Sequence, residues 1–198
     1  MGRRSDHSRT ELEALIVAEG HRLMAETGFA GFSAREVARR VGYSIGTIYN
    51  VFETLDHLLI AINSRTFELW TAYLGQRIEG GSHDRIRSLI EAYFDFAREH
   101  SHLWMAIYDH RLPPGMAMPE RDMEKRRALT RIVFREIARQ LPQRSETDIE
   151  HLARSLIATV HGHCTYELNG SFALMGEKDP IELALGRVRE AITAAAEA

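Results

Sequence analysis

The feature that most constrains this chain is a pair of short helix signals on either side of one glycine. Ser33 and Glu36 have the spacing of a capping box, in which a hydroxyl and a carboxylate each accept an otherwise unpaired amide at a helix start. Gly42 can end this first helix, and Ser44 can begin a second one about two turns long. Two short helices joined by a tight glycine-containing turn are typical of a helix-turn-helix unit.

The second short helix has one face that can be buried and one that presents polar groups. Ile48 and Phe52 lie four residues apart, so both can dock on the preceding helices. Ser44, Thr47 and Asn50 then remain outward or near the rim. We predict that this helix enters the major groove of double-stranded DNA. A helical corner with a solvated face is the structural alternative.

The remaining sequence has helical periodicity and no convincing alternating strand pattern. About nine helices are expected, at 8–27, 33–40, 44–51, 54–78, 83–100, 101–110, 119–140, 146–169 and 180–196. Gly28 and Pro142 are suitable stops, and Asp179 with Pro180 supplies a cap and a first residue for the last helix. The fold class is therefore all-α, with an N-terminal three-helix domain at 1–53 and a second helical domain at 54–198.

Composition and charge narrow the class of protein. The chain has 198 residues, of which 44% are hydrophobic and 27% charged, as in an ordinary globular protein. Its net charge of −3 gives no overall basic field, which argues mildly against nucleic-acid binding. The single cysteine, Cys164, cannot form an intrachain disulfide. The longest apolar run, 58–62, is too short to span a bilayer, and the N-terminus lacks an export signal, so we expect a cytoplasmic protein with no membrane partner.

Residues 28–59 resemble the DNA-binding domain of the tetracycline-repressor (TetR) family. The matching elements are Gly28-Phe29, Ser33, Val37-Ala38, Gly42, Ser44, Gly46-Thr47, Tyr49, Phe52 and Leu58-Leu59. The resemblance implies a homodimeric transcription regulator, usually a repressor that a small-molecule effector releases from its operator. One position departs from the family pattern, because Leu55 stands where a phosphate-binding lysine is usual. The positive charge must therefore come from other residues.

Predicted DNA contacts come from the N-terminal arm and from both short helices. They are Arg3, Arg4, Arg9, Ser33, Arg35, Ser44, Ile45, Thr47, Tyr49 and Asn50. The resemblance places Arg35 where it reaches a base edge, and guanine is its preferred partner. Ile45 and Thr47 can touch thymine methyl groups and Asn50 can pair with adenine, whereas Ser33 and Tyr49 are expected on phosphates. Arg39 and Arg40 fit a solvated face equally well.

The C-terminal part predicts a dimer interface. The helix at 146–169 carries apolar or small residues on two faces, so both faces should be buried. Alanine and glycine in 180–196 permit close approach of another helix. A homodimer through these two helices is the economical arrangement, and the resemblance implies the same one. Residues 158–170 also resemble a TetR subgroup with a His-Gly signature, although the upstream tryptophan often seen there is absent.

Aromatic side chains between these regions predict a pocket for a small apolar or aromatic effector, since buried tryptophan and tyrosine usually need polar partners. The candidate pocket residues are Trp70, Tyr73, Tyr93, Phe96, Trp104, Tyr108, His163 and Tyr166. Packing in the core is the alternative for each of them.

Enzymes and metal or redox sensors are the competing classes. A di-iron bundle needs two Glu-x-x-His motifs, and one occurs, at Glu99 and His102. His161 and His163 diverge by roughly 200° on a helix and cannot clamp one ion together, although a histidine from another helix can complete a site. Cys164 is a redox candidate, but a buried thiol is usually inert. We predict no catalytic residue, no metal and no cofactor.

Overall fold

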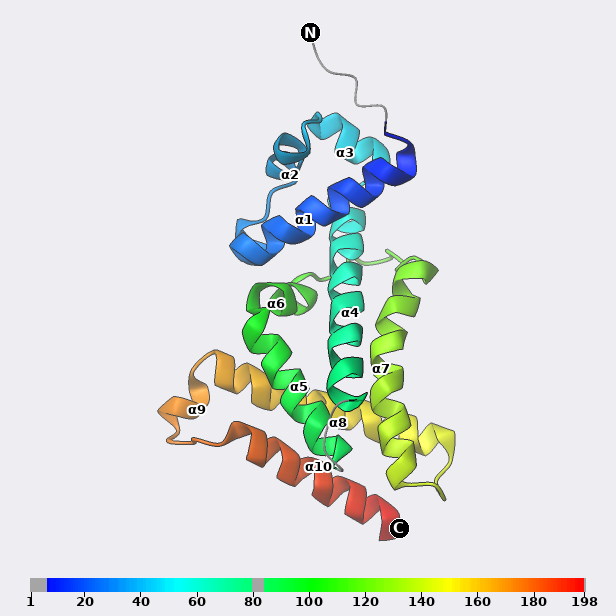
Figure 1. Cartoon of the computed structure of the whole chain (residues 1–198), viewed down its shortest axis with the longest axis vertical. Helices are drawn as coiled ribbons and strands as arrows, with labels where there is room; N and C mark the ends of the chain where they lie inside the picture. Colours follow the sequence, from blue (N-terminus) through cyan, green and yellow to red (C-terminus); the bar gives the residue numbers. More distant parts are fainter. Residues whose placement is uncertain (1–6, 80–83, 198) are drawn as a thin grey trace. The chain divides into compact units, whose positions relative to one another are not determined.

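The fold is all-α, as predicted. A computed structural model describes residues 7–79 and 84–197, and within them it contains ten helices and no strand (Figure 1). The helices are α1 (Arg9–Gly31), α2 (Ala34–Val41), α3 (Ile45–Phe52), α4 (Leu55–Glu79), α5 (Arg85–Glu99), α6 (Ser101–Asp109), α7 (Glu120–Gln140), α8 (Glu146–Leu168), α9 (Ser171–Leu174) and α10 (Pro180–Glu197). The short α9 has no counterpart among the nine expected helices. None of the described helices combines the length and apolarity needed to cross a membrane.

Local capping fixes the helix starts near the predicted positions. The hydroxyl of Ser44 accepts the amide of Thr47 at 3.1 Å, and that of Ser145 accepts the amide of Asp148 at 3.2 Å. Gly42 ends α2 with a φ of 78°, a left-handed conformation that strains other residues. These caps depend on neighbouring residues alone, which explains why the sequence predicts them well.

The predicted capping box at the start of α2 is only half formed. Ser33 Oγ accepts the amide of Glu36 at 3.4 Å, but the Glu36 carboxylate binds Arg39 and Arg40 instead of the amide of Ser33. A complete capping box occurs at the start of α1, where Ser8 and Glu11 satisfy each other's amides. The first helix also continues past its predicted end, to Gly31, across a kink at Gly28.

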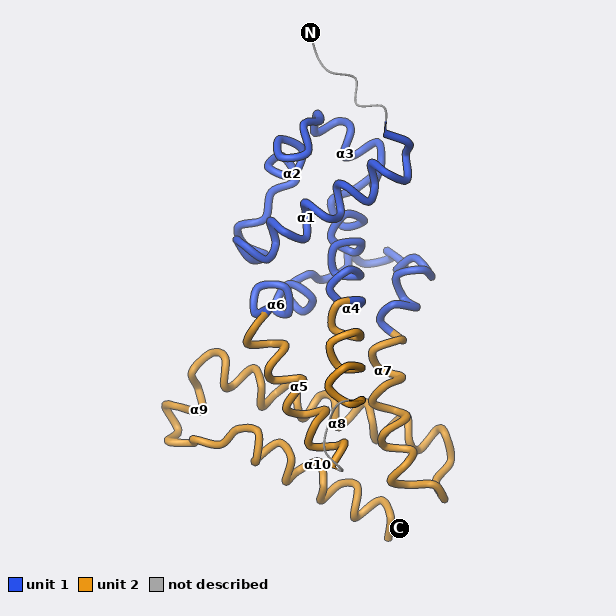
Figure 2. The backbone as a smooth tube through the Cα atoms, viewed as in Figure 1, with its two compact units in different colours: residues 1–68, 100–126 blue, residues 69–99, 127–198 orange. Residues whose placement is uncertain are grey.

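The chain divides into two compact units, coloured separately in Figure 2. Unit 1 comprises residues 1–68 and 100–126, and unit 2 comprises residues 69–99 and 127–198. Two of the three boundaries fall inside α4 and α7, so each of these helices contributes to both units, and the third falls between α5 and α6. This division differs from the predicted functional boundary at residue 53, which stays a prediction.

The core of unit 1 joins the three N-terminal helices to the start of α4 and to α6. Ile48 of α3 and Ile62 of α4 are fully buried in it. Gly20 permits a close crossing of α1 and α4, because a Cβ there would lie 2.6 Å from Ile62 Cδ1. His102 of α6 places Nδ1 2.9 Å from the carbonyl oxygen of Ala25 in α1. Helix α1 of the N-terminal region is thus packed directly on α6.

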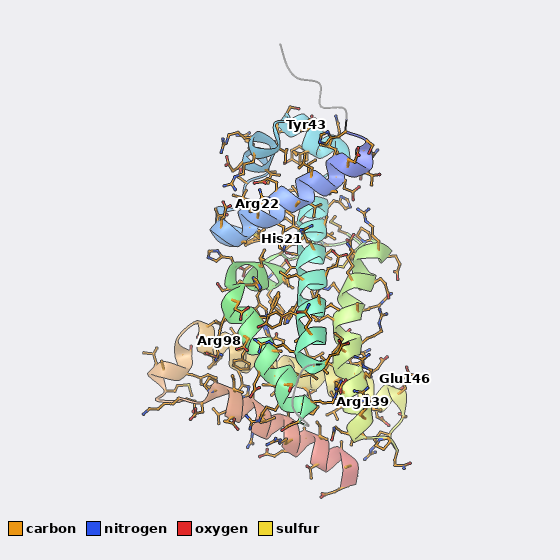
Figure 3. All side chains as sticks on the ribbon, in the orientation of Figure 1. His21, Arg22, Tyr43, Arg98, Arg139 and Glu146 are labelled. Atoms are coloured by element: carbon orange, nitrogen blue, oxygen red, sulfur yellow. The ribbon has the colours of Figure 1, made fainter. Side chains whose placement is uncertain are left out.

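Unit 2 is built around aromatic packing and ion pairs. Trp70 and Phe96 are stacked with ring centroids 4.9 Å apart and planes 5° from parallel. The Glu136 carboxylate, 1% exposed, receives two hydrogen bonds from Arg85, at 2.6 and 3.0 Å. Arg98 of α5, labelled in Figure 3, pairs with a carboxylate of α8. These contacts compensate the buried carboxylate of Glu136 and one oxygen of Glu167, whose other oxygen, Oε2, is buried without a hydrogen-bond partner.

Candidate DNA-binding surface and effector cavity

Helix α3 presents the polar face predicted for a recognition helix. Ser44, Tyr49 and Asn50 are exposed. Ile48 and Phe52, on the opposite side, are at most 4% exposed and anchor the helix. Burial of this apolar pair stabilises a helix that is too short to be stable alone.

The remaining predicted residues of α3 lie at the rim of this face. Ile45 and Thr47 are half-buried, so their methyl groups are partly accessible. The Thr47 hydroxyl lies 3.0 Å from the Ser44 hydroxyl. The same Ser44 hydroxyl accepts the amide of Thr47 and so caps the helix. Contact of any of these side chains with DNA stays a prediction.

The arginines of α2 differ in their partners. Arg39 and Arg40 both bind Glu36, and Arg40 also reaches Glu26 at 2.8 Å. Hydrogen bonds from Arg39 and Arg40 lower the pKa of Glu36 to about 2. Arg35 is exposed, and no carboxylate in the described ranges pairs with it. Arg35 therefore retains a charge available to an external anion.

The N-terminal arm is partly described. Arg9 is exposed at the start of α1, and Arg3 and Arg4 lie outside the described residues. The ring of His7 meets Tyr43 edge-on with centroids 6.4 Å apart, and Tyr43 lies in the turn before α3 (Figure 3). This contact, which the sequence did not predict, holds the start of α1 beside the turn that leads into the recognition helix.

The predicted pocket residues of α4 and α5 form one aromatic cluster in unit 2. Tyr93 and Trp70 are 4.9 Å apart, and Tyr73 meets Phe96 edge-on at 5.6 Å. The Tyr93 hydroxyl lies 3.1 Å from Nδ1 of His161. Because Trp70 and Phe96 are almost completely buried against each other, they serve as core whether or not a ligand binds nearby.

The other four candidates make ring contacts of their own. Trp104 and Tyr108 are neighbours on α6 in unit 1, with centroids 5.1 Å apart. His163 and Tyr166 both contact Phe172 of α9 in unit 2. All eight candidates thus make aromatic contacts within their own unit.

A small cavity in unit 2 is lined by apolar side chains. Its volume is about 50 Å³, and its walls include Tyr93, Leu156, Val160 and Val188. Tyr93 connects this cavity to the predicted pocket set. A void of this size between aliphatic side chains is a packing defect that a larger side chain can fill.

A larger cavity lies in unit 1, and the sequence analysis did not predict it. Its volume is about 320 Å³. Its apolar walls come from α4, α6, the segment 110–119 and α7, and its polar lining consists of Asn63, Ser64, His110 and Arg126. His110 is paired with Asp56 at 3.0 Å. The volume lies in the range of small-molecule sites.

Burial shifts the pKa values of Cys164 and His161 toward their neutral forms. Cys164 is fully buried, and burial raises the pKa of its thiol to about 12, which disfavours the reactive thiolate. Within the described residues, no three His, Cys, Asp or Glu side chains are arranged to hold a metal ion. Burial also lowers the pKa of His161.

Comparisons with protein families match two parts of the chain. Residues 16–62 match the model described as bacterial regulatory proteins, tetR family. Residues 86–187 match the model described as tetracyclin repressor-like, C-terminal domain. No curated protein sequence matches the chain significantly.

Solved structures share the fold over nearly the whole chain. A Rhodococcus sp. RHA1 protein of unknown function is 22% identical, with a TM-score of 0.71 over 96% of this chain and 97% of that one. Bacillus subtilis FadR, solved with stearoyl-CoA, is 14% identical, with a TM-score of 0.64 over 90% and 97% of the two chains. The multidrug binding protein EbrR, solved with imidazole, is 18% identical, with a TM-score of 0.60 over 94% and 96%.

Proposed function

Because the chain belongs to the TetR family of bacterial regulatory proteins, we propose that it is a ligand-responsive transcriptional repressor. It binds a palindromic operator and leaves the operator when a small apolar or aromatic effector binds. The observation that carries this proposal is the exposed polar face of α3, which lies next in the chain to a helix whose Arg35 has no carboxylate partner in the described residues.

The roles on DNA follow from the chemistry of each side chain. Arg35 donates to a guanine, Asn50 pairs with an adenine, and the methyl groups of Ile45 and Thr47 touch thymines. Phosphates are bound by Ser33, Tyr49 and the helix start at Ser44, and by the arm residues Arg3, Arg4 and Arg9. Such phosphate contacts position the protein without reading sequence. Arg39 and Arg40 contribute less, because Glu36 already neutralises part of their charge.

The repressor acts as a homodimer through α8 and α10. On α8, Ile157 and His161 are only half-buried in the single chain. Leu174 and Met175, just beyond α8, are 91% and 70% exposed, which leaves apolar surface for a second copy. Two recognition helices about 34 Å apart then meet successive major-groove faces of a palindrome. Sedimentation at micromolar concentration should show a dimer without DNA, and a folded monomer there would contradict this arrangement.

A small-molecule effector is supported by relatives of the same fold. FadR was solved with stearoyl-CoA and EbrR with imidazole. The predicted pocket set places the effector near Trp70, Tyr93 and the other aromatic candidates. The protein works in the cytoplasm, where its operator DNA is found, and needs no cofactor for DNA binding.

Operator selection tests the proposal. The purified full-length protein is incubated with a pool of random duplex DNA, and the bound sequences are enriched and read. A palindromic consensus is expected. If no sequence is enriched over repeated rounds with folded protein, the chain is not a sequence-specific repressor.

Two arginine variants then test the assigned roles on the selected operator. Arg35→Ala should cost about 1–3 kcal/mol of binding free energy and relax preference at one base pair. Arg39→Ala, the matched control, removes the same charge from the same helix but should cost less, because Glu36 binds Arg39. Equal losses for both variants, or an unchanged consensus for Arg35→Ala, would remove Arg35 from base recognition.

A further inference from the structure

Arg126 places an unneutralised charge on the wall of the unit 1 cavity. It is half-buried, and its guanidinium lies over the ring of Phe67, 4.6 Å from the ring centroid. No carboxylate in the described ranges pairs with it. Burial lowers the pKa of Arg126, but arginine stays protonated at any working pH. Because stacking uses only the face of the guanidinium, its in-plane N–H groups remain able to bind a carboxylate at two points.

Asn63 contributes a second unmet requirement to the same cavity. Its side chain is 5% exposed and its Oδ1 atom is buried without a hydrogen-bond partner. Its Nδ2 atom donates to the carbonyl oxygen of Ala106 at 3.3 Å, which fixes the orientation of the amide. A buried acceptor left in this state is unfavourable. Because Oδ1 itself is shielded, a ligand donor reaches it when neighbouring side chains adjust around the ligand, and the new bond recovers that loss.

The remaining cavity walls determine which kind of ligand body fits. Phe67, Ile107 and Met118 are among the apolar side chains that enclose the cavity of about 320 Å³. Methionine adapts to different shapes, so these walls accept a flexible apolar body. His110 also lines the cavity, but its Nε2 is already engaged by Asp56 at 3.0 Å.

From this lining we infer that the effector is an organic acid with an apolar body and a hydroxyl or amide N–H donor, bound in the unit 1 cavity with its carboxylate on Arg126 and its donor on Asn63. The inference rests on the proposed function for the term effector, but it replaces the site near Trp70 and Tyr93 and gives the apolar effector an acid group. It also places that site in unit 1, whereas the aromatic cluster of the predicted pocket lies in unit 2.

The site has a direct structural route to the helix-turn-helix region. The bond from Asn63 to the Ala106 carbonyl joins α4 to α6, and Ile107 of α6 lines the cavity. On the same helix, His102 bonds to the carbonyl of Ala25 in α1. An acid that binds more tightly to an arrangement of α6 incompatible with DNA lowers operator affinity through α1. The whole route lies within unit 1.

Calorimetric titration of the full-length protein with three probes tests the chemical class. The probes are 3-hydroxydecanoate, with acid and donor; decanoate, with the acid alone; and methyl 3-hydroxydecanoate, with the donor alone. We expect 3-hydroxydecanoate to bind most tightly and decanoate several-fold more weakly. The ester should bind at least about tenfold more weakly than the hydroxy acid, because it lacks the charge that pairs with Arg126.

Arg126→Met is the deciding variant, and Lys125→Met is its matched control. Lys125 is adjacent in sequence and pairs with Glu68 at 2.9 Å, away from the cavity lining. Arg126→Met should weaken both acids at least about tenfold and leave the ester unchanged, whereas Lys125→Met should bind all three probes as the wild type does. Met118→Trp, which fills the cavity without changing charge, should abolish binding of all three.

The outcomes separate this inference from the proposed function. Failure of both acids to bind at millimolar concentration, or equal affinities in wild type and Arg126→Met, overturns the inference. Wild-type affinity in a folded Met118→Trp variant overturns the location. Operator binding is measured separately on the ligand-free protein. If an operator is selected but neither acid binds, the proposed repressor function stands and only the inference about the effector fails. If the acids bind at Arg126 but no operator is selected, the proposed function is refuted and the acid-binding site stands.

Discussion

Two half-buried arginines, one in each unit, differ in how their charge is balanced. In unit 2, Arg85 donates two hydrogen bonds to the buried carboxylate of Glu136, and Arg139 adds a further contact at 2.8 Å. In unit 1, Arg126 stacks on the aromatic ring of Phe67, and no carboxylate among the described residues pairs with it. Charge is thus balanced at Arg85 and left open at Arg126.

The two cavities follow the same division. The unit 2 cavity is about 50 Å³ and apolar, whereas the unit 1 cavity is about 320 Å³ and includes Arg126 and the unpartnered oxygen of Asn63. A protein interior normally satisfies its buried polar groups, so the exceptions mark places where something else can bind. We therefore regard the unit 1 cavity, which combines an uncompensated cation with space for a ligand, as the place that gains most from a ligand.

The largest expected difference between the units is in stability. Arg85→Met should lower the free energy of unfolding by about 1–3 kcal/mol, because the buried Glu136 carboxylate loses two hydrogen bonds and keeps those from Arg139. Arg126→Met should change the ligand-free value by less than about 1 kcal/mol, since no ion pair is broken. Urea denaturation of both variants at neutral pH measures this difference. A loss of 3 kcal/mol for Arg126→Met would mean that its charge is already compensated and the comparison is wrong.

Much of the fold could be predicted because its signals are local. Gly42, Ser44 and Ser145 each define a helix end through contacts with residues a few positions away. The prediction that the Glu36 carboxylate completes a capping box was wrong, although the signal is also local. Its spacing to Ser33 suits an amide, but two arginines on the same helix compete for the carboxylate, and spacing alone does not decide that competition.

The unit 1 cavity could not be predicted because it depends on long-range packing. Asn63 and Arg126 are on different helices, and Arg126 belongs to a charged stretch that resembles a solvated face. One signal was available, because Arg126 falls at helical spacing with Leu129 and Val133, on a stripe that faces inward. A charge on an inward stripe is a reason to search for an anionic ligand.

Lowering the pH should reduce the stability of unit 2, because Glu136 becomes protonated. Hydrogen bonds from Arg85 hold the pKa of Glu136 below its ordinary value near 4.5. A carboxyl group with a lowered folded-state pKa stabilises the fold above its unfolded pKa, and this contribution is lost as pH falls through the folded value. The stability advantage of wild type over Glu136→Gln should therefore be full at pH 7 and shrink below about pH 4.5.

Urea midpoints between pH 7 and pH 3 measure this dependence. Glu150→Gln, on α8 and paired with Arg154 at its surface, controls for the loss of one negative charge. An advantage of wild type over Glu136→Gln that stays constant down to pH 3 would show that the Arg85 pair does not set the acid response of unit 2.

The smallest expected effect comes from filling the unit 2 cavity. Val160→Ile adds one methylene to a wall residue of that cavity and keeps a β-branched side chain, so the rotamer preference on α8 is preserved. Burying one methylene contributes at most about 0.8 kcal/mol, and we expect a gain of about 0.5 kcal/mol in the free energy of unfolding. Affinity for 3-hydroxydecanoate should stay at the wild-type value, because the unit 1 cavity is unchanged. If Val160→Ile instead weakens the acid as strongly as Met118→Trp does, the effector occupies unit 2, beside Tyr93 of the predicted aromatic set, and the contrast between the two cavities has been assigned the wrong way round.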